Sequence, residues 1–216
     1  MNKRVCLVAP SLLAANPLHL AQALDDCTRA DADRVHLDVM DGHFVPNLAL
    51  NPATVRSICA YSSLKTDVHI MAKPYEPVLR LFLDIPCTSL TVHIEAMASH
   101  NHLTTQVKAA GKELGMAINP HTPLTDLDPW LDNLDHVVLM GVEPGFGGQP
   151  FQQAQLDRLR ALHAKKKNRS FLIHVDGGVT SDLAPILKEA GAEVLVAGTS
   201  FFNQQSPLEN MKDLRV

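Results

Sequence analysis

The chain has 216 residues, of which 46% are hydrophobic and 19% are charged, and its mean hydropathy is close to zero. This composition is typical of a globular protein and excludes disordered, collagen-like and coiled-coil classes. Nineteen basic and 23 acidic residues give a net charge of −4. We expect no nucleic-acid partner, because phosphate backbones attract basic surfaces. The length fits one domain spanning residues 1–216.

The four cysteines are widely separated and form no C-x-x-C pair, so neither a zinc ribbon nor a disulfide framework is expected. They are typical of small buried residues in a reducing compartment. Pro10 and then Asn16–Pro17 interrupt the apolar stretch near the start of the chain, and no run approaches the roughly 18 apolar residues of a membrane span. We therefore expect a cytoplasmic protein with no membrane partner. The oligomeric state stays open, and a homo-oligomer is compatible with the sequence.

Short apolar or β-branched runs recur from one end of the chain to the other and predict eight strands. They lie near residues 5–9, 34–40, 65–71, 89–94, 114–118, 136–142, 171–175 and 194–197. The spacing between successive runs leaves room for one helix in each crossover, which is the connection that parallel strands require.

Helix signals lie between these runs. Asn16–Pro17 and Asn51–Pro52 each combine an N-cap residue with a proline suited to the first helical position. A later helix is expected to begin at residue 180 or 181 and to stop at Gly191. The last helix, near residues 207–214, is expected to be short.

Eight strands that are each followed by a helix predict an α/β protein, a single compact (β/α)8 TIM barrel. The alternative is an open, doubly wound sheet. Such a sheet commonly carries a glycine-rich dinucleotide fingerprint after its first strand, where this chain has Pro-Ser-Leu-Leu at residues 10–13. The sequence therefore favours the barrel.

Ionisable side chains occupy inward positions on three of the predicted strands. Alternate residues of a strand share a face, so His36 and Asp38 point away from the apolar face of the second strand, as do His69 on the third and Asp176 on the seventh. Barrel enzymes keep their active sites at the C-terminal ends of the strands. Two imidazoles and two carboxylates suit Zn²⁺, Fe²⁺, Co²⁺ or Mn²⁺. One inward histidine alone is more often a core residue, but four converging positions favour a metal site.

Other histidines have weaker functional signals. His93 and Glu95 follow the same alternation on the fourth strand, but we do not expect either to be a direct metal ligand. Six further histidines are expected at the surface: His19, His100, His102, His121, His136 and His163.

Glycine-rich segments follow the last three predicted strands. They are Gly145-Phe146-Gly147-Gly148, Gly177-Gly178 and Gly198-Thr199-Ser200. Barrels of this kind often bind phosphate in their last quarter through backbone N–H groups and the N-terminus of a short helix. The sequence therefore predicts a phosphate site beside the metal that needs no lysine.

Several motifs resemble those of the ribulose-phosphate 3-epimerase family, in order and over nearly the whole chain. They are PSLL at residues 10–13, HLDVMDGHFVPN at 36–47, DVHIM at 67–71, NPHTP at 119–123, PGFGGQ at 144–149 and VDGGV at 175–179. The resemblance implies a barrel of the ribulose-phosphate-binding type. It also implies a metal-dependent isomerase that interconverts D-ribulose 5-phosphate and D-xylulose 5-phosphate in the pentose phosphate pathway.

The resemblance also implies roles for individual residues. It puts the metal ligands on His36, Asp38, His69 and Asp176, and the two proton-transferring acids on Asp38 and Asp176. The implied substrate contacts are Ser11, His69, Met40, Met71, Met140, Gly145, Phe146, Gly147, Gly148, Asp176, Gly177, Gly178, Gly198 and Thr199. Such an enzyme inverts C3 of a ketose phosphate, with one carboxylate on each face of an enediolate that the metal stabilises.

Two departures from the family pattern lie near the expected site: Gly141 stands where Ser or Thr is common, and His174 where an acidic or amide residue is common. A sister epimerase acting on a six-carbon ketose phosphate, such as D-allulose 6-phosphate, would use the same metal and acids and stays open. A phosphate-barrel decarboxylase is disfavoured, because the third strand lacks the lysine of a D-x-K-x-x-D signature. A catalytically silent barrel is disfavoured because Asp38 and Asp176 are both present.

Overall fold

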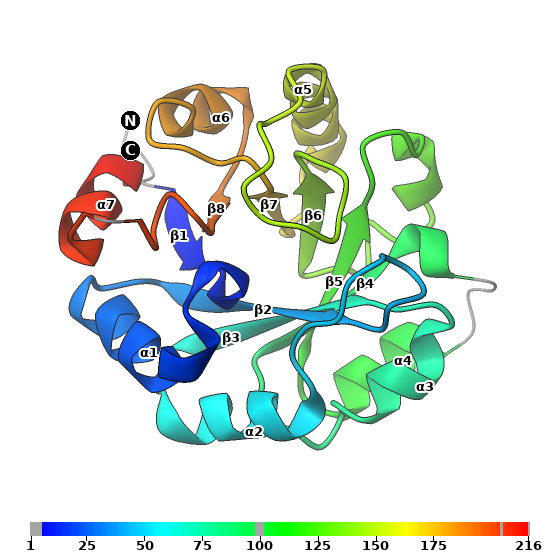
Figure 1. Ribbon diagram of the computed structural model, residues 1–216. Helices are drawn as coiled ribbons and strands as arrows, with labels where there is room; N and C mark the ends of the chain where they lie inside the picture. Colours follow the sequence, from blue (N-terminus) through cyan, green and yellow to red (C-terminus); the bar gives the residue numbers. More distant parts are fainter. Residues whose placement is uncertain (1–5, 98–101, 204, 216) are drawn as a thin grey trace.

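The computed structural model describes residues 6–97, 102–203 and 205–215. Within them, eight strands form one parallel sheet with helices around its outside (Figure 1). The strands are β1 (Leu7–Pro10), β2 (Arg34–Met40), β3 (Lys65–Met71), β4 (Ser89–His93), β5 (Glu113–Ile118), β6 (His136–Met140), β7 (Leu172–Asp176) and β8 (Val194–Ala197). The α-helices are α1 (Leu20–Arg29), α2 (Pro52–Tyr61), α3 (Tyr75–Arg80), α4 (Leu103–Ala109), α5 (Gln155–Lys166), α6 (Ala184–Ala190) and α7 (Pro207–Leu214).

The sheet curls round until its two ends meet. Its strand order is β1-β8-β7-β6-β5-β4-β3-β2, and every pair is parallel. The first and last strands of this order approach each other at a parallel bridge between Ser11 and His36. The Val8 N–H also donates to Asp33 Oδ2 at 2.9 Å across the same gap. The predicted (β/α)8 barrel is therefore confirmed.

Two of the predicted helix starts follow the capping chemistry of the sequence, whereas α6 begins at Ala184 and not at residue 180 or 181. Asn16 Oδ1 accepts a hydrogen bond from the Leu18 N–H, and Asn51 Oδ1 accepts one from the Thr54 N–H, both at 3.0 Å. Asn16 begins a short 3-10 helix, Pro17–His19, that leads into α1. The α7 helix is as short as expected.

One crossover differs from the expected helix after every strand. Between β5 and β6, residues 119–135 form only a 3-10 helix, Leu124–Leu127, followed by turns. Prolines at positions 120, 123 and 129 explain the difference, because each lacks an N–H donor and disfavours a helical residue before it. The sixth strand also stops at Met140, two residues earlier than predicted.

The core has an apolar layer between strands and helices and a partly polar barrel interior. Val35, Leu37 and Val39 of β2 are at most 5% exposed and face the helices. At the N-terminal end of the barrel, Arg34 Nη1 lies 3.0 Å from both carboxylate oxygens of Asp67, and Ser89 donates to the same carboxylate. A buried ion pair therefore fills the N-terminal end of the barrel interior.

The prediction that His136 is a surface residue is wrong. The side chain is 1% exposed, and its Nε2 lies 2.7 Å from Thr91 Oγ1 across the barrel. Gly115 makes room for the ring, because a Cβ there would lie 2.1 Å from His136 Nε2. The surface prediction is confirmed for His19, His102, His121 and His163, whereas His100 lies outside the described residues.

Candidate metal centre and active site

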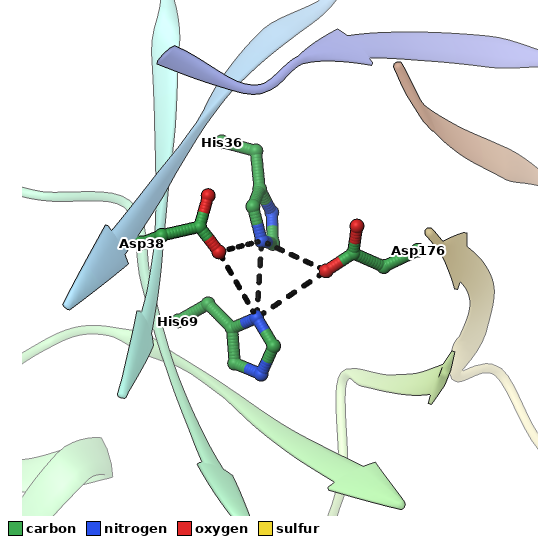
Figure 2. Close-up of side chains that lie close together, drawn as sticks. All are labelled: His36, Asp38, His69 and Asp176. Carbon is green, nitrogen blue, oxygen red and sulfur yellow. Dashed lines mark hydrogen bonds and ion pairs between the residues drawn. The ribbon is translucent and has the colours of Figure 1, made fainter. Parts of the chain in front are cut away.

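Four ionisable side chains converge at the C-terminal end of the barrel (Figure 2). His36 and Asp38 come from β2, His69 from β3, and Asp176 from the last position of β7. The alternation of strand residues turns all four toward the axis. One ligand atom from each residue lies within 4.8 Å of the other three, so the cluster could hold a metal ion.

The distances between these atoms fit a small divalent ion. His36 Nε2 lies 3.2 Å from His69 Nδ1, 3.6 Å from Asp38 Oδ1 and 3.5 Å from Asp176 Oδ2. His69 Nδ1 lies 3.6 and 3.4 Å from the same two oxygens. A tetrahedral ion with bonds of about 2.0–2.2 Å separates its ligand atoms by about 3.3–3.6 Å. The donor set and its spacing therefore match a metal centre.

The charges of the cluster support one another. Burial alone would raise the pKa of Asp38, but His36 and His69 outweigh burial and hold that pKa well below its ordinary value. The pKa of Asp176 is lowered in the same way. Burial would lower the pKa of His36, yet the two carboxylates raise it well above the ordinary value, and the pKa of His69 is also raised. A cation entering the cluster would take the place of protons.

Ser11 orients one of the two carboxylates. Its hydroxyl donates to Asp38 Oδ2 at 2.7 Å, which leaves Asp38 Oδ1 to face the two imidazoles. The backbone of Ser11 is itself held by the bridge that closes the barrel. Barrel closure and carboxylate orientation are thus linked through one residue.

A cavity of about 420 Å³ opens above the cluster. Asp38 and Asp176 reach its surface, whereas His69 is fully buried beneath it. The other residues expected to contact substrate also line this cavity: Ser11, Met40, Met71, Met140, Gly145, Phe146, Gly147, Gly148, Gly177, Gly178, Gly198 and Thr199. Segments from six strand ends therefore contribute to one cavity.

Two adjacent glycines shape the floor of the cavity. Gly177 and Gly178 have φ values of +98° and +71°, where L side chains are strained. A Cβ at Gly178 would lie 2.4 Å from the backbone nitrogen of Phe151, and one at Gly177 would lie 2.4 Å from a methyl carbon of Val142. Directly after β8 the chain makes a single turn, in which the Phe202 N–H donates to the Gly198 carbonyl.

The loop between β6 and α5 forms one wall of the cavity. Asn47 Nδ2 donates to the Gly145 carbonyl at 2.7 Å and ties this loop to the one after β2. Gln149 Nε2 donates to the Glu143 and Phe146 carbonyls, both at 2.8 Å. The Phe146 ring is 53% exposed at the cavity mouth.

His93 and Glu95 lie beside the cluster and not within it. His93 Nε2 is 2.8 Å from His69 Nε2, the nitrogen that points away from the cluster, and His93 Nδ1 is 3.2 Å from Glu95 Oε2. Burial lowers the pKa of His93 to about 4. The inward alternation on the fourth strand is confirmed for His93 but not for Glu95, which lies in a 3-10 helix, Ile94–Ala96, after β4.

A second pair of histidines, His136 and His174, lies inside the barrel. Strand alternation predicts the inward position of His174, two residues before Asp176, but sequence analysis missed His136 and the contact between the two rings. The rings of His136 and His174 stack with centroids 4.5 Å apart and planes 13° apart. Burial lowers the pKa of His136 to about 4 and that of His174 well below its ordinary value. One signal was available: His136 is four residues before the inward-facing Met140 on the same strand, so both share a face.

Comparisons with known proteins agree with this geometry. Residues 7–202 match the model of the ribulose-phosphate 3-epimerase family. The chain belongs to this family. It is 38% identical to a ribulose-phosphate 3-epimerase of Bacillus subtilis (strain 168), with 96% of this chain and 97% of the relative covered. The identity is 37% to one of Escherichia coli (strain K12), covering 97% and 94%, and 36% to a chloroplastic one of Arabidopsis thaliana, covering 99% and 78%. The family is one of isomerases, and the expected enzyme class is confirmed.

Solved structures extend the likeness of fold. A 3-keto-L-gulonate-6-phosphate decarboxylase from Vibrio cholerae superposes with a TM-score of 0.69 at 13% identity, covering 97% of this chain and 94% of that one. An orotidine 5'-monophosphate decarboxylase from Sulfolobus solfataricus gives 0.67 at 14% identity, covering 97% and 95%. At such identities the likeness concerns the barrel alone. Among the described residues, no helix is long and apolar enough to span a membrane.

Proposed function

We propose that this epimerase interconverts D-ribulose 5-phosphate and D-xylulose 5-phosphate by moving a proton at C3. The observation that carries the proposal is the convergence of two carboxylates, Asp38 and Asp176, on a cavity that is also lined by glycine loops. Inversion next to a carbonyl requires a proton to leave one face of the carbon and another to arrive at the opposite face. One base cannot reach both faces, whereas two carboxylates from β2 and β7 can.

The two acids share the neighbouring imidazoles but differ in their other contacts. The Ser11 hydroxyl and both imidazoles stabilise the anionic form of Asp38. Burial and the Asp38 charge act against ionisation of Asp176, but His36 and His69 outweigh them, so the pKa of Asp176 is lowered as well. Inversion requires one carboxyl to be ionised and the other to be protonated at the start, so we infer that Asp176 carries the proton when Asp38 acts as the base, and that the roles exchange in the reverse reaction.

His36, Asp38, His69 and Asp176 would hold one divalent ion, with Zn²⁺, Fe²⁺, Co²⁺ and Mn²⁺ as candidates. Such an ion supplies Lewis-acid stabilisation of the negative charge that develops on the sugar oxygens. Met40, Met71 and Met140 surround the reacting end of the cavity with apolar surface. They exclude water there without offering strong hydrogen bonds that would compete for the sugar.

The phosphate would occupy the glycine-lined end of the cavity. Gly177, Gly178, Gly198 and Thr199 lie there, and backbone N–H groups at such turns can bind an anion without a lysine side chain. The Gly145–Gly148 loop, with Phe146 at the mouth, would cover the bound sugar. The distance from the bound phosphate to the two acids would then have to match the distance from the phosphate to C3 of the sugar, which would favour one sugar length over another.

We also propose a cytoplasmic location. All four cysteines are free, and burial raises the pKa of Cys27 to about 12 and those of Cys6 and Cys87 to about 11. Thiols of this kind act as small core residues and gain nothing from an oxidising compartment.

The test is turnover of D-ribulose 5-phosphate in deuterated water by protein loaded with each candidate metal. We expect D-xylulose 5-phosphate with deuterium at C3. D-allulose 6-phosphate, the substrate of the alternative sister activity, is the parallel sample, and we expect a lower kcat/KM for it. A higher kcat/KM for the six-carbon sugar would overturn the proposed substrate, and no conversion of either sugar would overturn the reaction.

A further inference from the structure

A chain of hydrogen-bonding groups leads from the metal cluster to the edge of the barrel. It runs from His69 Nε2 to His93 Nε2 at 2.8 Å, and from His93 Nδ1 to Glu95 Oε2 at 3.2 Å. The two imidazole planes differ by 16° and their centroids are 4.9 Å apart, so the rings meet edge to edge, as an N–H···N hydrogen bond requires. Both histidines are fully buried, so bulk water does not compete for these nitrogens.

Glu95 sets the direction of this chain. Its Oε1 accepts the Asn119 N–H at 2.8 Å, while its Oε2 faces His93 Nδ1. A backbone N–H is always a donor, and an ionised carboxylate is always an acceptor. These hydrogen bonds, together with one from Thr122, hold the pKa of Glu95 below its ordinary value despite burial. Glu95 therefore presents an acceptor to His93 at neutral pH.

The position of each proton follows from Glu95. His93 Nδ1 carries a hydrogen and donates it to Glu95, so the other nitrogen of a neutral His93 ring is an acceptor. His69 Nε2 must then be the donor of the 2.8 Å contact. In a neutral His69 this leaves the Nδ1 lone pair pointing at the oxygens of Asp38 and Asp176. That is the form in which an imidazole can bind a metal ion.

We propose that Glu95 and His93 are positioning residues that fix the tautomer of His69, so that its Nδ1 lone pair faces the metal centre. The inference rests on the metal centre of the proposed function and adds two residues that do not themselves touch the ion. Partners of this kind orient ligand imidazoles and increase their basicity.

Replacing Glu95 by glutamine gives the sharpest consequence. The side chain keeps its shape but has one acceptor and one donor group. The Asn119 N–H requires the acceptor at Oε1, so the amide NH₂ must face His93 Nδ1. His93 then carries its hydrogen on Nε2, His69 Nε2 becomes the acceptor, and a hydrogen moves to His69 Nδ1, where the metal should bind. Glu95→Ala has no such effect, because water can either donate to His93 Nδ1 or accept from it.

The experiment measures Co²⁺ affinity of the metal-stripped full chain, by visible absorption in competition with a chelator. We expect Glu95→Gln to weaken binding by about 10–100-fold, and Glu95→Ala to weaken it less. His93→Phe removes the connection, so adding Glu95→Gln to His93→Phe should cause no further loss. Long-range ¹H–¹⁵N spectra of the histidine rings should show His93 as the Nδ1–H tautomer in the wild type and as the Nε2–H tautomer in Glu95→Gln.

Several results would overturn the inference. They are an unchanged Co²⁺ affinity in Glu95→Gln, a larger loss in Glu95→Ala than in Glu95→Gln, or an Nε2–H tautomer of His93 in the wild type. Thermal unfolding of each variant identifies one that has lost its fold, and the wild-type spectrum tests the tautomer without any variant. None of these measurements uses sugar turnover, so failure of the proposed substrate and failure of this inference remain distinguishable.

Discussion

His93, His136 and His174 are interior histidines that burial keeps neutral. Each is at most 1% exposed, and burial is the main cause of each lowered pKa. A neutral imidazole can stack on another ring and accept a hydrogen bond, whereas a charged one has two donor nitrogens and no acceptor, and is costly to bury. Their neutrality at pH 7 is part of what lets a polar interior remain folded.

Acid should destabilise the fold through His136 in particular. Its pKa is lowered from 6.5 to about 4 on folding, so below pH 6.5 the unfolded chain binds a proton that the folded chain does not. Stability contributed by the neutral ring is full above pH 6.5 and is lost as pH falls toward 4. The loss is about 2 kcal/mol by pH 5. We expect urea unfolding of the metal-free protein to show this difference. Between pH 7.5 and pH 5, the free energy of unfolding should fall by about 2 kcal/mol less in His136→Leu than in wild type.

The matched control for this prediction is Thr91→Val. It removes the hydroxyl that faces His136 Nε2 but keeps the imidazole, so it should lower stability by a similar amount at both pH values. An equal pH dependence for wild type and His136→Leu would contradict the neutral, buried state of His136.

At this scale the sequence predicted the cluster well and its surroundings poorly. His36, Asp38 and His69 follow from strand alternation alone, because β2 and β3 keep a regular pleat through all seven of their residues. The stacking of His136 on His174 could not be predicted, because it depends on the stagger between β6 and β7 and on the space that Gly115 leaves. Rotamers and ring contacts of this kind are set by packing, which no single strand encodes.

At the scale of elements, the loops after β6, β7 and β8 line the part of the cavity where we propose that the phosphate binds. At Gly178 the Cβ position is occupied by the backbone of Phe151, in the loop after β6. Gly147 on the same cavity differs, since no atom lies within 4 Å of its Cβ position. The two glycines therefore allow a matched comparison.

Gly178→Ala should impair phosphate binding. A methyl group 2.4 Å from the Phe151 nitrogen must push the two loops apart, and the positive φ adds strain. We expect kcat/KM for the sugar phosphate to fall at least roughly tenfold, with KM carrying most of the change, because the proposed role of these loops is to bind the phosphate and not the reacting carbon. Steady-state kinetics should leave Gly147→Ala within about threefold of wild type. Equal effects of the two substitutions would contradict the assignment of the phosphate end.

The ends of helices were predictable where a capping residue or a proline lies next to the apolar pattern of a helix. Asn51–Pro52 marks the start of α2, and the short α7 also matches its predicted range. The crossover from β5 to β6 was predicted as a helix because a helix there is the rule for this fold, whereas local proline chemistry prevailed. The local sequence thus determines whether a helix forms where the packing of the barrel does not require one.

For the whole molecule, barrel closure brings the two acids together. Asp38 and Asp176 are far apart in sequence, and only the pairing of β1 with β8 and the Ser11–His36 bridge make β2 and β7 face each other across the cavity. The sequence predicted this arrangement through the number of strands and the regularity of their connections. The four candidate ligands therefore come together only in the closed barrel, so metal binding should depend on the folded state of the whole barrel.

A bound ion should stabilise the whole fold. A ligand that binds only the folded chain, at 100 times its Kd, contributes about 2.7 kcal/mol, which for a chain of this size raises Tm by about 5–10 °C. Differential scanning calorimetry with Co²⁺ or Zn²⁺ should show this shift in wild type, and His69→Gln should lose most of it. A shift of equal size in His69→Gln would place the ion elsewhere.

The most direct test of the two-acid centre is hydrogen exchange at C3 in metal-loaded Asp38→Asn and Asp176→Asn, with metal content measured in each sample. Each epimer is incubated separately in deuterated water. The wild type should exchange and interconvert both epimers. Each variant keeps one base, so each should exchange only one epimer, a different one in the two variants, while interconversion falls about 10²–10⁴-fold. Near wild-type interconversion by either variant, or exchange of the same epimer by both, would contradict the account.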